Sequence, residues 1–375
     1  MTPLAVGITC YPTFGGSGII ATEIGLELAR RGHRVHFICS AVPWRLPHFQ
    51  DRVFLHEVET RDYPLFDHTS YVLALASKMV EVATFHHLDL LHVHYAIPHA
   101  TAGYLAQQIL GAKAPKLITT LHGTDITLVG NDRSFLPITR FSVEQSDCIT
   151  TPSQFLASAT RDNLGLAGDF PIEVISNFVD PQKFVPPTTT APREPIIVHN
   201  SNFRPVKRVE DTIRVLAAVH AQRPCRLVLI GDGPERSRVE RLVRELGLQQ
   251  AVVFLGKQVE LVEVLQTAQV FLQPSESESF GLAALEAMSC GVPVVGTDVG
   301  GVAEVVEQGH SGFLFPVGDI GGMAAAVVRI LDDPALFSSL SARSRAIAET
   351  RFPLGAMVDR YEATYRRLLA VRSSP

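Results

Sequence analysis

The sequence LAVGITCYPTFGGSGIIATEIGLELARR (residues 4–31) decides the fold, because it joins a buried strand, a glycine-rich turn and a helix. The apolar run Leu4–Cys10 predicts a strand covered on both faces, and a helix is expected from about Ser17 to Arg31. Glycines in the intervening GGSG let the backbone approach a ligand closely, and the helix start offers N–H donors to a phosphate. The turn matches neither Gly-x-Gly-x-x-Gly nor the Gly-Lys-Ser/Thr phosphate loop, so a plain tight turn is an equal alternative.

Outward from this unit, strand-forming runs keep alternating with helical periodicity. Alternation of this kind predicts parallel sheets with right-handed crossovers. Further strands are expected at Val35–Cys39, Val53–Val58, Leu90–His94, Lys116–Leu121, Cys148–Thr151 and Ile172–Ile175, and helices at Ser70–Ala83, Pro98–Leu110, Phe135–Gln145 and Ser153–Asn163.

A second series of strands follows a stretch rich in proline and threonine, residues 177–195, whose composition predicts a linker. The second series comprises Ile196–His199, Leu227–Ile230, Val252–Leu255, Val270–Leu272, Val292–Gly296 and Gly312–Phe315. The sequence therefore predicts an α/β protein of two Rossmann-like, doubly wound parallel-sheet domains, residues 1–176 and 196–353. We expect them to face a central cleft, the usual ligand site of such sheets. Two helical stretches follow Pro334, and the last, about 354–375, is expected to pack back on the first domain.

Length and composition limit the classes of function that the chain can have. The 375 residues suffice for two domains, and 46% hydrophobic with 19% charged residues describe a globular protein. A formal net charge of −5 gives no general attraction to nucleic acid or to an anionic membrane. Without an apolar run of spanning length or a signal sequence, a cytosolic protein is expected. The five scattered cysteines are expected to be buried, reduced thiols.

Two glutamates eight positions apart, Glu278 and Glu286, occur in the segment SESFGLAALEA (residues 277–287). Glu278 belongs to a turn that ends at Gly281. Glu286 lies about five residues into an amphipathic helix, where its side chain can lean back over the helix start. Both carboxylates can then face one helix N-terminus, which suits a phosphate, as in a nucleotide sugar. For the pair taken alone, a solvated helix face is the alternative.

A basic segment, SNFRPVKR (residues 201–208), follows the first strand of the second series. Arg204 offers a planar guanidinium and Lys207 a compact charge, and together they can neutralise a diphosphate without a metal ion. Basic groups at a helix start oppose the helix dipole, so a bound anion would explain them; a solvated helix start is the alternative. GDGPE (residues 231–235) is either a turn beneath a nucleotide or a plain strand-to-helix turn.

Histidines mark strand ends in the first series. His122, in LHGTD (residues 121–125), ends a strand and turns toward the expected cleft, unless backbone groups simply satisfy it. Asp125 could instead be the N-cap of the next segment. His92 and His94 alternate on one strand, so their imidazoles face the same side. With no third ligand at metal-binding spacing nearby and no Asp-x-Asp motif, neither a metal nor a cofactor is expected.

The phrase PSESESFGLAALEAM (residues 274–288), followed by GVPVV (residues 291–295), closely resembles the Glu-x7-Glu motif of the retaining glycosyltransferases of family 4. That family has two Rossmann-like domains, the GT-B architecture. The resemblance implies that Glu278 faces the donor sugar and that Glu286 holds the ribose hydroxyls. It also implies that backbone N–H groups of Phe280, Gly281 and Leu282 meet sugar or phosphate oxygens.

The same resemblance implies further roles. Gly15, Gly16 and Ser17 would face the donor diphosphate, Arg204 and Lys207 would stabilise the departing UDP, Gly231 would lie beneath the nucleotide, and His122 would lie near the donor sugar and the attacking hydroxyl. The implied catalytic residues are His122, Arg204, Lys207 and Glu278. Family members commonly carry the arginine five residues before the lysine, where this chain has Asn202, so the lysine assignment is the firmer one.

GITCYPTFGGSG (residues 7–18), ATE (21–23) and HYAIPH (94–99) are similar to family members that use UDP-N-acetylglucosamine as donor and L-malate as acceptor, in bacillithiol biosynthesis. Malate carries two carboxylates, so its pocket needs cations and hydroxyls. The candidates are Ser17, Tyr95, Thr119, Thr120 and Arg140, although surface exposure explains Arg140 equally well. The implied reaction retains the anomeric configuration, because the acceptor attacks from the side on which the diphosphate leaves.

Three alternatives stay open. A sister enzyme of family 4 would use an inositol phosphate, a sugar or a lipid as acceptor. A UDP-sugar 2-epimerase shares the architecture but would need acid/base groups in place of an acceptor pocket. A nucleotide-binding regulator without activity fits the filled set of motifs less well. The sequence predicts no nucleic-acid partner and no stable membrane association, and it is compatible with a homo-oligomer.

Overall fold

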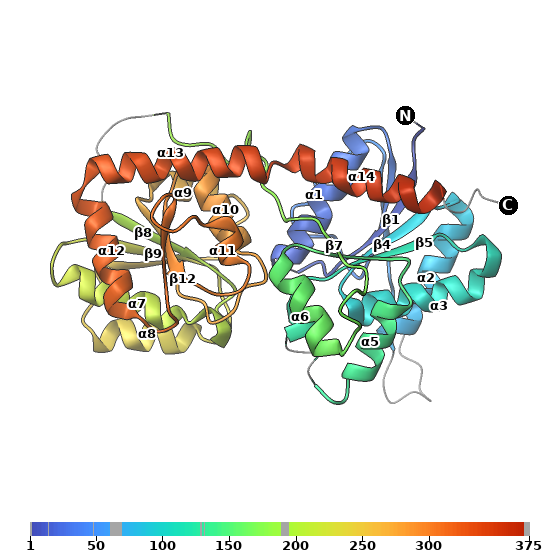
Figure 1. Ribbon diagram of the computed structural model, residues 1–375, viewed down its shortest axis with the longest axis horizontal. Coiled ribbons are helices and arrows are strands. Elements are labelled where there is room, and N and C mark those ends of the chain that lie inside the picture. Colours follow the sequence, from blue (N-terminus) through green and yellow to red (C-terminus); the bar gives the residue numbers. More distant parts are fainter. Residues whose placement is uncertain are drawn as a thin grey trace. The chain divides into compact units, whose positions relative to one another are not determined.

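The structure, a computed structural model, describes residues 2–13, 15–47, 49–60, 70–127, 130, 132–188 and 195–370. The chain divides into two compact units (Figure 1): unit 1 comprises Met1–Ser176 and Gly355–Pro375, and unit 2 comprises Asn177–Leu354. Residues 189–194 of the expected linker and 371–375 of the expected last helix lie outside the described residues. Within the described ranges, no helix has both the length and the apolarity that a membrane span requires.

Unit 1 is built on seven parallel strands in the order β3-β2-β1-β4-β5-β6-β7. The strand order reverses between β1 and β4, so the loops after these two strands form the switch point where such sheets bind ligands. Every residue of β1 and β4 is buried, because helices cover both faces of the sheet. The strands are β1 (Ala5–Thr9), β2 (Arg34–Cys39), β3 (Val53–Glu57), β4 (Leu90–His94), β5 (Lys116–Thr120), β6 (Cys148–Thr151) and β7 (Glu173–Val174).

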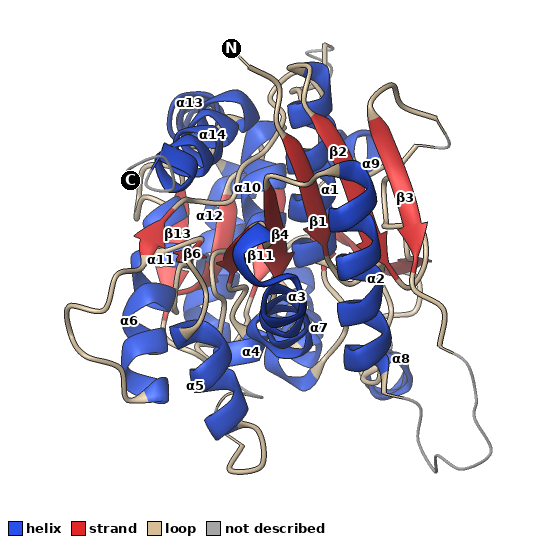
Figure 2. Cartoon of the chain, turned by 90° about the vertical axis from the view of Figure 1, so that its right-hand side faces the viewer, coloured by secondary structure: helices blue, strands red, loops and turns tan. Residues whose placement is uncertain are grey.

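The helices of unit 1 include the last helix of the chain. Tyr361 and Tyr365 of α14 are buried, and the hydroxyl of Tyr365 lies 2.7 Å from Nδ1 of His92 in β4. The helical elements are α1 (Gly16–Arg30), α2 (Tyr71–His86), η1 (Ala96–Ala100), α3 (Thr101–Leu110), η2 (Gly111–Lys113), α4 (Thr124–Thr127), α5 (Leu136–Glu144), α6 (Gln154–Leu164) and α14 (Leu354–Ala370). Figure 2 shows β3 at the edge of this sheet, beside β2.

Unit 2 repeats the plan with six parallel strands in the order β10-β9-β8-β11-β12-β13. Its switch point lies between β8 and β11. The strands are β8 (Ile196–Asn200), β9 (Arg226–Ile230), β10 (Val252–Gly256), β11 (Val270–Gln273), β12 (Val294–Thr297) and β13 (Gly312–Phe315). The helical elements are η3 (Pro205–Lys207), α7 (Val209–His220), α8 (Arg236–Glu245), α9 (Val262–Thr267), α10 (Leu282–Ser289), α11 (Val302–Val305), α12 (Ile320–Asp332) and α13 (Pro334–Arg351).

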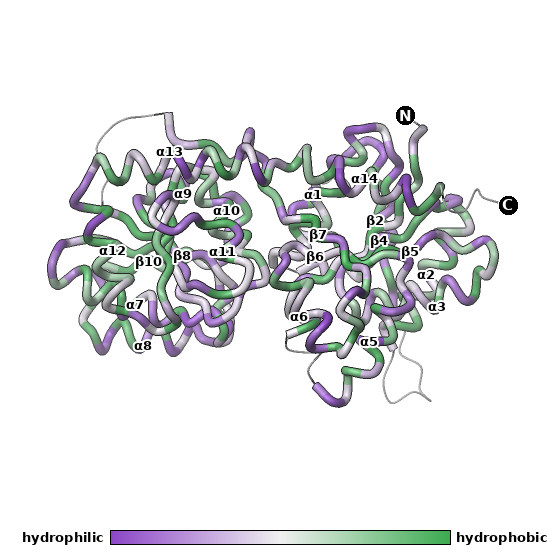
Figure 3. Tube along the Cα trace, viewed as in Figure 1, coloured by the Kyte–Doolittle hydropathy of each residue, from purple (hydrophilic) through white to green (hydrophobic). Residues whose placement is uncertain are grey.

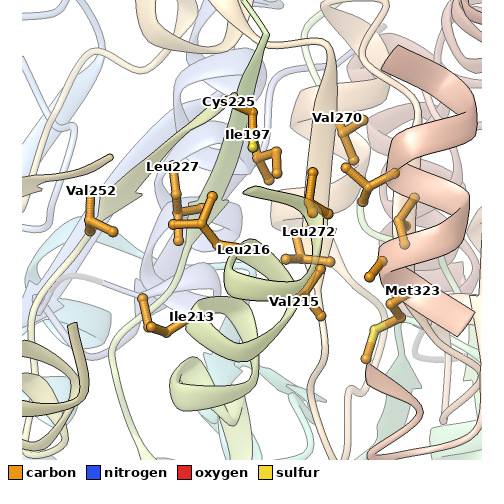
Figure 4. Close-up of a cluster of buried hydrophobic side chains, with 14 of the residues drawn as sticks. Ile197, Ile213, Val215, Leu216, Cys225, Leu227, Val252, Val270, Leu272 and Met323 are labelled. Carbon is orange, nitrogen blue, oxygen red and sulfur yellow. The ribbon is translucent and has the colours of Figure 1, made fainter. Parts of the chain in front are cut away.

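Apolar side chains between the strands and the helices form the core of each unit. Hydrophobic residues concentrate along the central strands (Figure 3). In unit 2, Ile197, Leu227 and Leu272 from three neighbouring strands pack against Ile213 and other residues of α7 (Figure 4). Burial of such side chains is the main favourable term in folding, at about 25 cal/mol per Å² of apolar surface. All five cysteines are free thiols, and four of them are buried.

The predicted class of two doubly wound parallel sheets is confirmed, and each predicted strand is present within about two residues of its expected ends. One helix starts later than expected. Ile97 has extended backbone angles (φ −124°, ψ 138°), as favoured before Pro98, so the regular helix α3 begins at Thr101. The first part of the expected linker belongs to unit 2, and Phe184 is buried in the core of that unit.

Candidate active site

The loops after β8 and β11 meet at the switch point of unit 2. Nζ of Lys207, in η3, lies 2.7 Å from Oε1 of Glu278, in the loop after β11. The hydroxyl of Ser275 donates to the same carboxylate oxygen at 2.8 Å. The backbone N–H of Glu276 donates to the carbonyl of Val206 at 2.8 Å, which joins the two loops. Two of the four residues expected to be catalytic are therefore in direct contact.

Glu278 is ionised in this arrangement. Burial raises the pKa of its carboxyl, but the charge and hydrogen bond of Lys207, with hydrogen bonds from Ser275 and Gln273, outweigh burial and leave the pKa below its usual value. The side chain of Lys207 is 22% exposed and that of Glu278 is 11% exposed. The lysine charge is thus held in place by a carboxylate and still reaches solvent, where it can meet an anion.

Helix α10 begins directly after this loop. Gly281 precedes it with φ 96°, a left-handed conformation that glycine adopts without strain. Glu286 is the fifth residue of the helix and is 4% exposed. Contrary to expectation, α10 is not an amphipathic surface helix, because all residues from Ala284 to Ser289 are buried. Its eight residues still present an N-terminus at the switch point, and that N-terminus suits a phosphate.

Phe280 can serve the site only through its backbone. Its ring is buried and packs edge to face against Phe352, with 5.4 Å between centroids. The turn that carries Phe280 also packs closely against the turn that contains Gly301. A Cβ added at Gly301 would come within 2.3 Å of the carbonyl oxygen of Ser279. The backbone N–H of Gly301 donates to the carbonyl of Glu278 at 2.9 Å. The side-chain packing of Phe280 and this turn–turn contact fix the position of the loop.

The close packing of two loops requires a glycine at position 231. Gly231 has φ 111°, and a Cβ there would come within 1.7 Å of the carbonyl oxygen of Ser201. A Cβ at Gly233 would come within 2.0 Å of the carbonyl oxygen of Asn202. The turn after β9 therefore supports the basic loop after β8, and this packing accounts for its glycines whether or not a nucleotide lies above it.

The two arginines of the basic loop differ in their partners. Arg208 donates to Asp211 at 2.6 Å, so its charge is engaged within α7. Arg204 is exposed, and its side chain has no ion pair or hydrogen bond with any residue that the structure describes. Arg204 is therefore the arginine with a charge available to a ligand.

The switch point of unit 1 carries the glycine turn and an aromatic pair. The rings of Tyr11, after β1, and Tyr95, after β4, pack edge to face, with an angle of 72° between their planes and 5.1 Å between centroids. Gly18 allows the turn to close over the start of α1, because a Cβ there would come within 2.7 Å of the carbonyl oxygen of Tyr11. Gly15 and Ser17 are partly exposed and Gly16 is exposed at this helix start. The turn thus presents N–H groups as expected.

His122 is held by a second histidine. Its Nε2 lies 2.8 Å from Nδ1 of His94 in β4, and the two rings are stacked. His92 and His94 lie on the same side of β4, as predicted, with ring centroids 4.5 Å apart. Nε2 of His92 lies 2.7 Å from the hydroxyl of Thr120. The expected role of His122 stays a prediction, but its orientation is fixed by its neighbours.

These histidines are neutral at physiological pH. Burial, followed by the nearby His99, lowers the pKa of His122 to about 3. Burial and His122 lower the pKa of His92 to about 3 as well. A neutral imidazole offers one donor and one acceptor, so His122 can orient a hydroxyl group but is a poor acceptor of a proton.

Asp125 is not an N-cap. It lies within α4, is almost fully buried, and accepts backbone N–H groups of His122 and Gly123 through Oδ1 and of Ala96 through Oδ2. Burial raises the pKa of this carboxyl to about 6, against the opposing effect of these hydrogen bonds. Asp125 therefore braces the loop after β5 against the loop after β4.

Three of the expected acceptor residues have other partners in the structure. Thr119 and Thr120 are fully buried. The hydroxyl of Thr119 lies 2.8 Å from that of Ser146, before β6, and the hydroxyl of Thr120 lies 2.6 Å from that of Thr150 in β6, so both hydroxyls have partners within unit 1. Arg140 is on the surface in an ion pair of 2.9 Å with Glu144 one helical turn away. Only Ser17 and Tyr95 of the five lie at the switch point.

Tyr95 has an unusual backbone. Its φ is 89°, and a positive φ in an aromatic residue is strained, which occurs most often at functional sites. Its ring also contacts His122, at 5.3 Å between centroids. From sequence, His94 is weighed as a metal ligand and forms part of the segment HYAIPH, but neither interpretation predicts its contact with His122. The signal that could have placed it is the pairing of neighbouring strand ends, because His94 lies in register with Thr120, two residues before His122.

A shallow surface pocket of about 380 Å³ lies elsewhere, at the amino end of β5. Its polar groups already bind one another: Lys116 and Gln107 contact Asp147 at 2.6 and 2.9 Å. Ligands of doubly wound sheets bind at the carboxyl ends of strands, so this pocket is at the wrong end for the site.

Comparison with known proteins gives two adjoining family matches. Residues 14–183 match the family model "Glycosyltransferase Family 4", and residues 182–350 match "Glycosyl transferases group 1". The N-acetyl-alpha-D-glucosaminyl L-malate synthase of Bacillus anthracis is 43% identical over 98% of this chain and 97% of its own length. The D-inositol 3-phosphate glycosyltransferase of Mycolicibacterium smegmatis is 28% identical over 95% of this chain and 87% of its own length.

Solved structures show the same fold. HepE of Anabaena, crystallised with UDP and glucose, superposes with a TM-score of 0.81 at 21% identity, covering 96% of this chain and 99% of its own. The sucrose-phosphate synthase of Thermosynechococcus elongatus superposes with a TM-score of 0.80 at 25% identity, covering 98% of this chain and 100% of its own.

Proposed function

The chain belongs to the family 4 glycosyltransferases, and on this basis we propose that it transfers N-acetylglucosamine from UDP-N-acetylglucosamine to the hydroxyl group of L-malate. The product would be the first intermediate of bacillithiol biosynthesis. Similarity along nearly the full length of the chain to a malate synthase supports this choice of donor and acceptor.

The observation that carries the proposal is the Lys207–Glu278 ion pair beside the N-terminus of α10. A diphosphate at this switch point would meet the lysine charge and the N–H groups of the helix start. We assign Glu286, in the same helix, to the ribose hydroxyls and Glu278 to the donor sugar. In the free enzyme Glu278 keeps Lys207 in position, so little reorganisation precedes binding of the donor.

The chemistry follows from the charge that develops on UDP. As the bond between the sugar and the diphosphate breaks, Lys207 and the available Arg204 stabilise the departing oxygen. The malate hydroxyl attacks from the side on which UDP leaves, and a diphosphate oxygen takes its proton, so the anomeric configuration is retained. His122, neutral and fixed by His94, orients the reacting groups.

We assign the acceptor to the switch point of unit 1. The exposed start of α1 offers N–H groups and the hydroxyl of Ser17 to a carboxylate, and Tyr95 offers a second hydroxyl from the facing loop. Arg140 is engaged by Glu144 and is not part of this assignment.

The test is UDP release from UDP-N-acetylglucosamine measured across a panel of acceptors: L-malate, other hydroxy acids, inositol phosphates and simple sugars. We expect release with L-malate and at most weak release with the others. Preference for an inositol phosphate or a sugar would favour the sister-enzyme alternative. Formation of an epimerised UDP sugar in the absence of any acceptor would instead favour a 2-epimerase.

A further inference from the structure

Three histidines gather at the edge of the sheet in unit 1, away from the residues discussed above. His36 lies in β2, His56 in the edge strand β3, and His86 is the last residue of α2. Each offers a ring nitrogen, and these three nitrogens all lie within 4.8 Å of one another. We propose that His36, His56 and His86 form a binding site for one divalent transition-metal ion, of which Zn²⁺ is the best fit.

The spacing of the nitrogens suits coordination. Nδ1 of His36 lies 3.0 Å from Nε2 of His56. On a tetrahedral ion with Zn–N bonds of about 2.0–2.1 Å, two ligand nitrogens are about 3.3 Å apart. A hydrogen bond between two imidazole nitrogens also requires a lone pair on one of them, so at least one of these rings is neutral and can act as a ligand.

His36 supplies the second, independent observation. It is 1% exposed, and its Nε2 is buried without a hydrogen-bond partner among the described residues. Leaving a buried polar group unpaired costs about 1–3 kcal/mol, and such groups in native proteins call for an explanation. A bound ion would be such a partner once the ring turns so that Nε2, in place of Nδ1, faces the other two histidines.

The ring arrangement shows what binding would change. The rings of His36 and His56 are stacked at 5.2 Å, and those of His36 and His86 are tilted at 4.3 Å between centroids. A modest rotation of the side chains would let the three lone pairs converge. His56 and His86 are half-buried, which permits that rotation and leaves a fourth position open to water. Three imidazoles and a water are a common ligand set for Zn²⁺.

The place of the site in the fold indicates its consequence. Among the strands that the structure describes, β3 pairs with β2 alone. His36 lies in register with Gly7 in the interior of β1, not at the carboxyl end where the transfer chemistry is proposed. An ion held by β2, β3 and the end of α2 would join an edge strand to its neighbour and to a helix. Because it binds only the folded protein, it would stabilise unit 1 without taking part in the reaction.

The test uses the full chain without a histidine tag, treated with chelator and dialysed, and titrated with Co²⁺ and Zn²⁺ separately. Co²⁺ is followed by its visible absorption and Zn²⁺ by calorimetry, with thermal unfolding recorded in parallel. We expect one equivalent of metal per chain and a higher melting temperature with Zn²⁺. His56→Gln and His86→Gln should each weaken metal binding by roughly 10²-fold or more and abolish the thermal shift.

The matched control is His87→Asn, beside the cluster. His87 is exposed and ends α2 in a left-handed conformation (φ 53°) that asparagine also tolerates. Both variants of the cluster change half-buried residues, so they should fold, and their melting temperatures without metal check this. Metal affinity that is unchanged in His56→Gln and His86→Gln, or a wild type that binds less than one equivalent, would overturn the proposal.

Discussion

Lys207 is the residue on which the proposed reaction depends most. In the proposed reaction it would provide the cation for the leaving UDP, and the ion pair with Glu278 would fix its position in advance. We predict that Lys207→Ala lowers kcat by about 10²-fold or more, as other losses of preorganised charge do. Lys183→Ala is the matched control, because Lys183 is a lysine of the same unit paired with an exposed glutamate. Steady-state UDP release compares them, and an equal loss in both variants would remove Lys207 from its assigned role.

Glu286 should act on nucleotide binding more than on turnover. If its carboxylate holds the ribose hydroxyls, Glu286→Ala loses charged hydrogen bonds worth about 1.5–3 kcal/mol, which raises the Kd of UDP roughly 10- to 100-fold. Glu276→Ala, at an exposed position in the preceding loop, should leave the Kd unchanged. Calorimetric titration with UDP decides the point: equal affinity in the wild type and Glu286→Ala would refute the ribose assignment.

His122 should give no pH dependence in the range where histidines usually titrate. Burial lowers its pKa to about 3, so the ring gains a proton only far below pH 5 and is neutral from pH 5 to 9. His122→Gln should lower kcat/KM roughly 10- to 100-fold through lost positioning, with the same pH profile as the wild type. His310→Gln, on the surface of unit 2, is the control. A wild-type inflection near pH 6.5 that disappears in His122→Gln would contradict this.

At the scale of elements, the turn after β9 carries the basic loop. Gly231→Ala combines a positive φ with a clash against the carbonyl of Ser201, and we expect it to cost roughly 2–5 kcal/mol of unfolding free energy. Gly247→Ala, at φ 69° in open space, isolates the cost of the backbone conformation alone, roughly 1–2 kcal/mol. Urea unfolding of both variants measures the difference, and equal midpoints would show that the two turns are not tightly packed.

The strands were predictable because their signal is local. Short apolar runs bounded by turn residues gave every strand of both sheets, and their alternation with helices gave the parallel topology. The character of α10 was not predictable in the same way. The face of α10 that was expected to meet solvent is covered by other elements of unit 2, including α13. The hydrophobic periodicity of an eight-residue segment does not reveal such tertiary contacts.

Side-chain roles at the strand ends depended on contacts that the sequence does not display. Thr120 bonds to Thr150 because β5 and β6 are neighbours in the sheet, so the hydroxyl of Thr120 is not available to a ligand. The contact that Asp125 makes between two loops depends likewise on the loop after β4, because Oδ2 of Asp125 accepts the backbone N–H of Ala96. The glycine turn, the basic loop and the paired glutamates were found from sequence because each is a contiguous motif.

At the scale of the whole molecule, each unit supplies one set of groups at its own switch point. Unit 2 holds Lys207, Glu278 and the start of α10, and unit 1 holds the glycine turn, Tyr95 and His122. The two strand series and their motifs made this division predictable. The histidine cluster was not predictable, because His36 and His56 are 20 residues apart and meet only through the pairing of β2 with β3.

The most direct test of the central claim is proton NMR of the wild-type protein with UDP-N-acetylglucosamine and L-malate, followed in time. The account predicts one equivalent of UDP for each N-acetylglucosamine joined to the malate hydroxyl, with the α configuration of the donor kept in the product. A β-linked product, or loss of the UDP sugar without any link to malate, would contradict it.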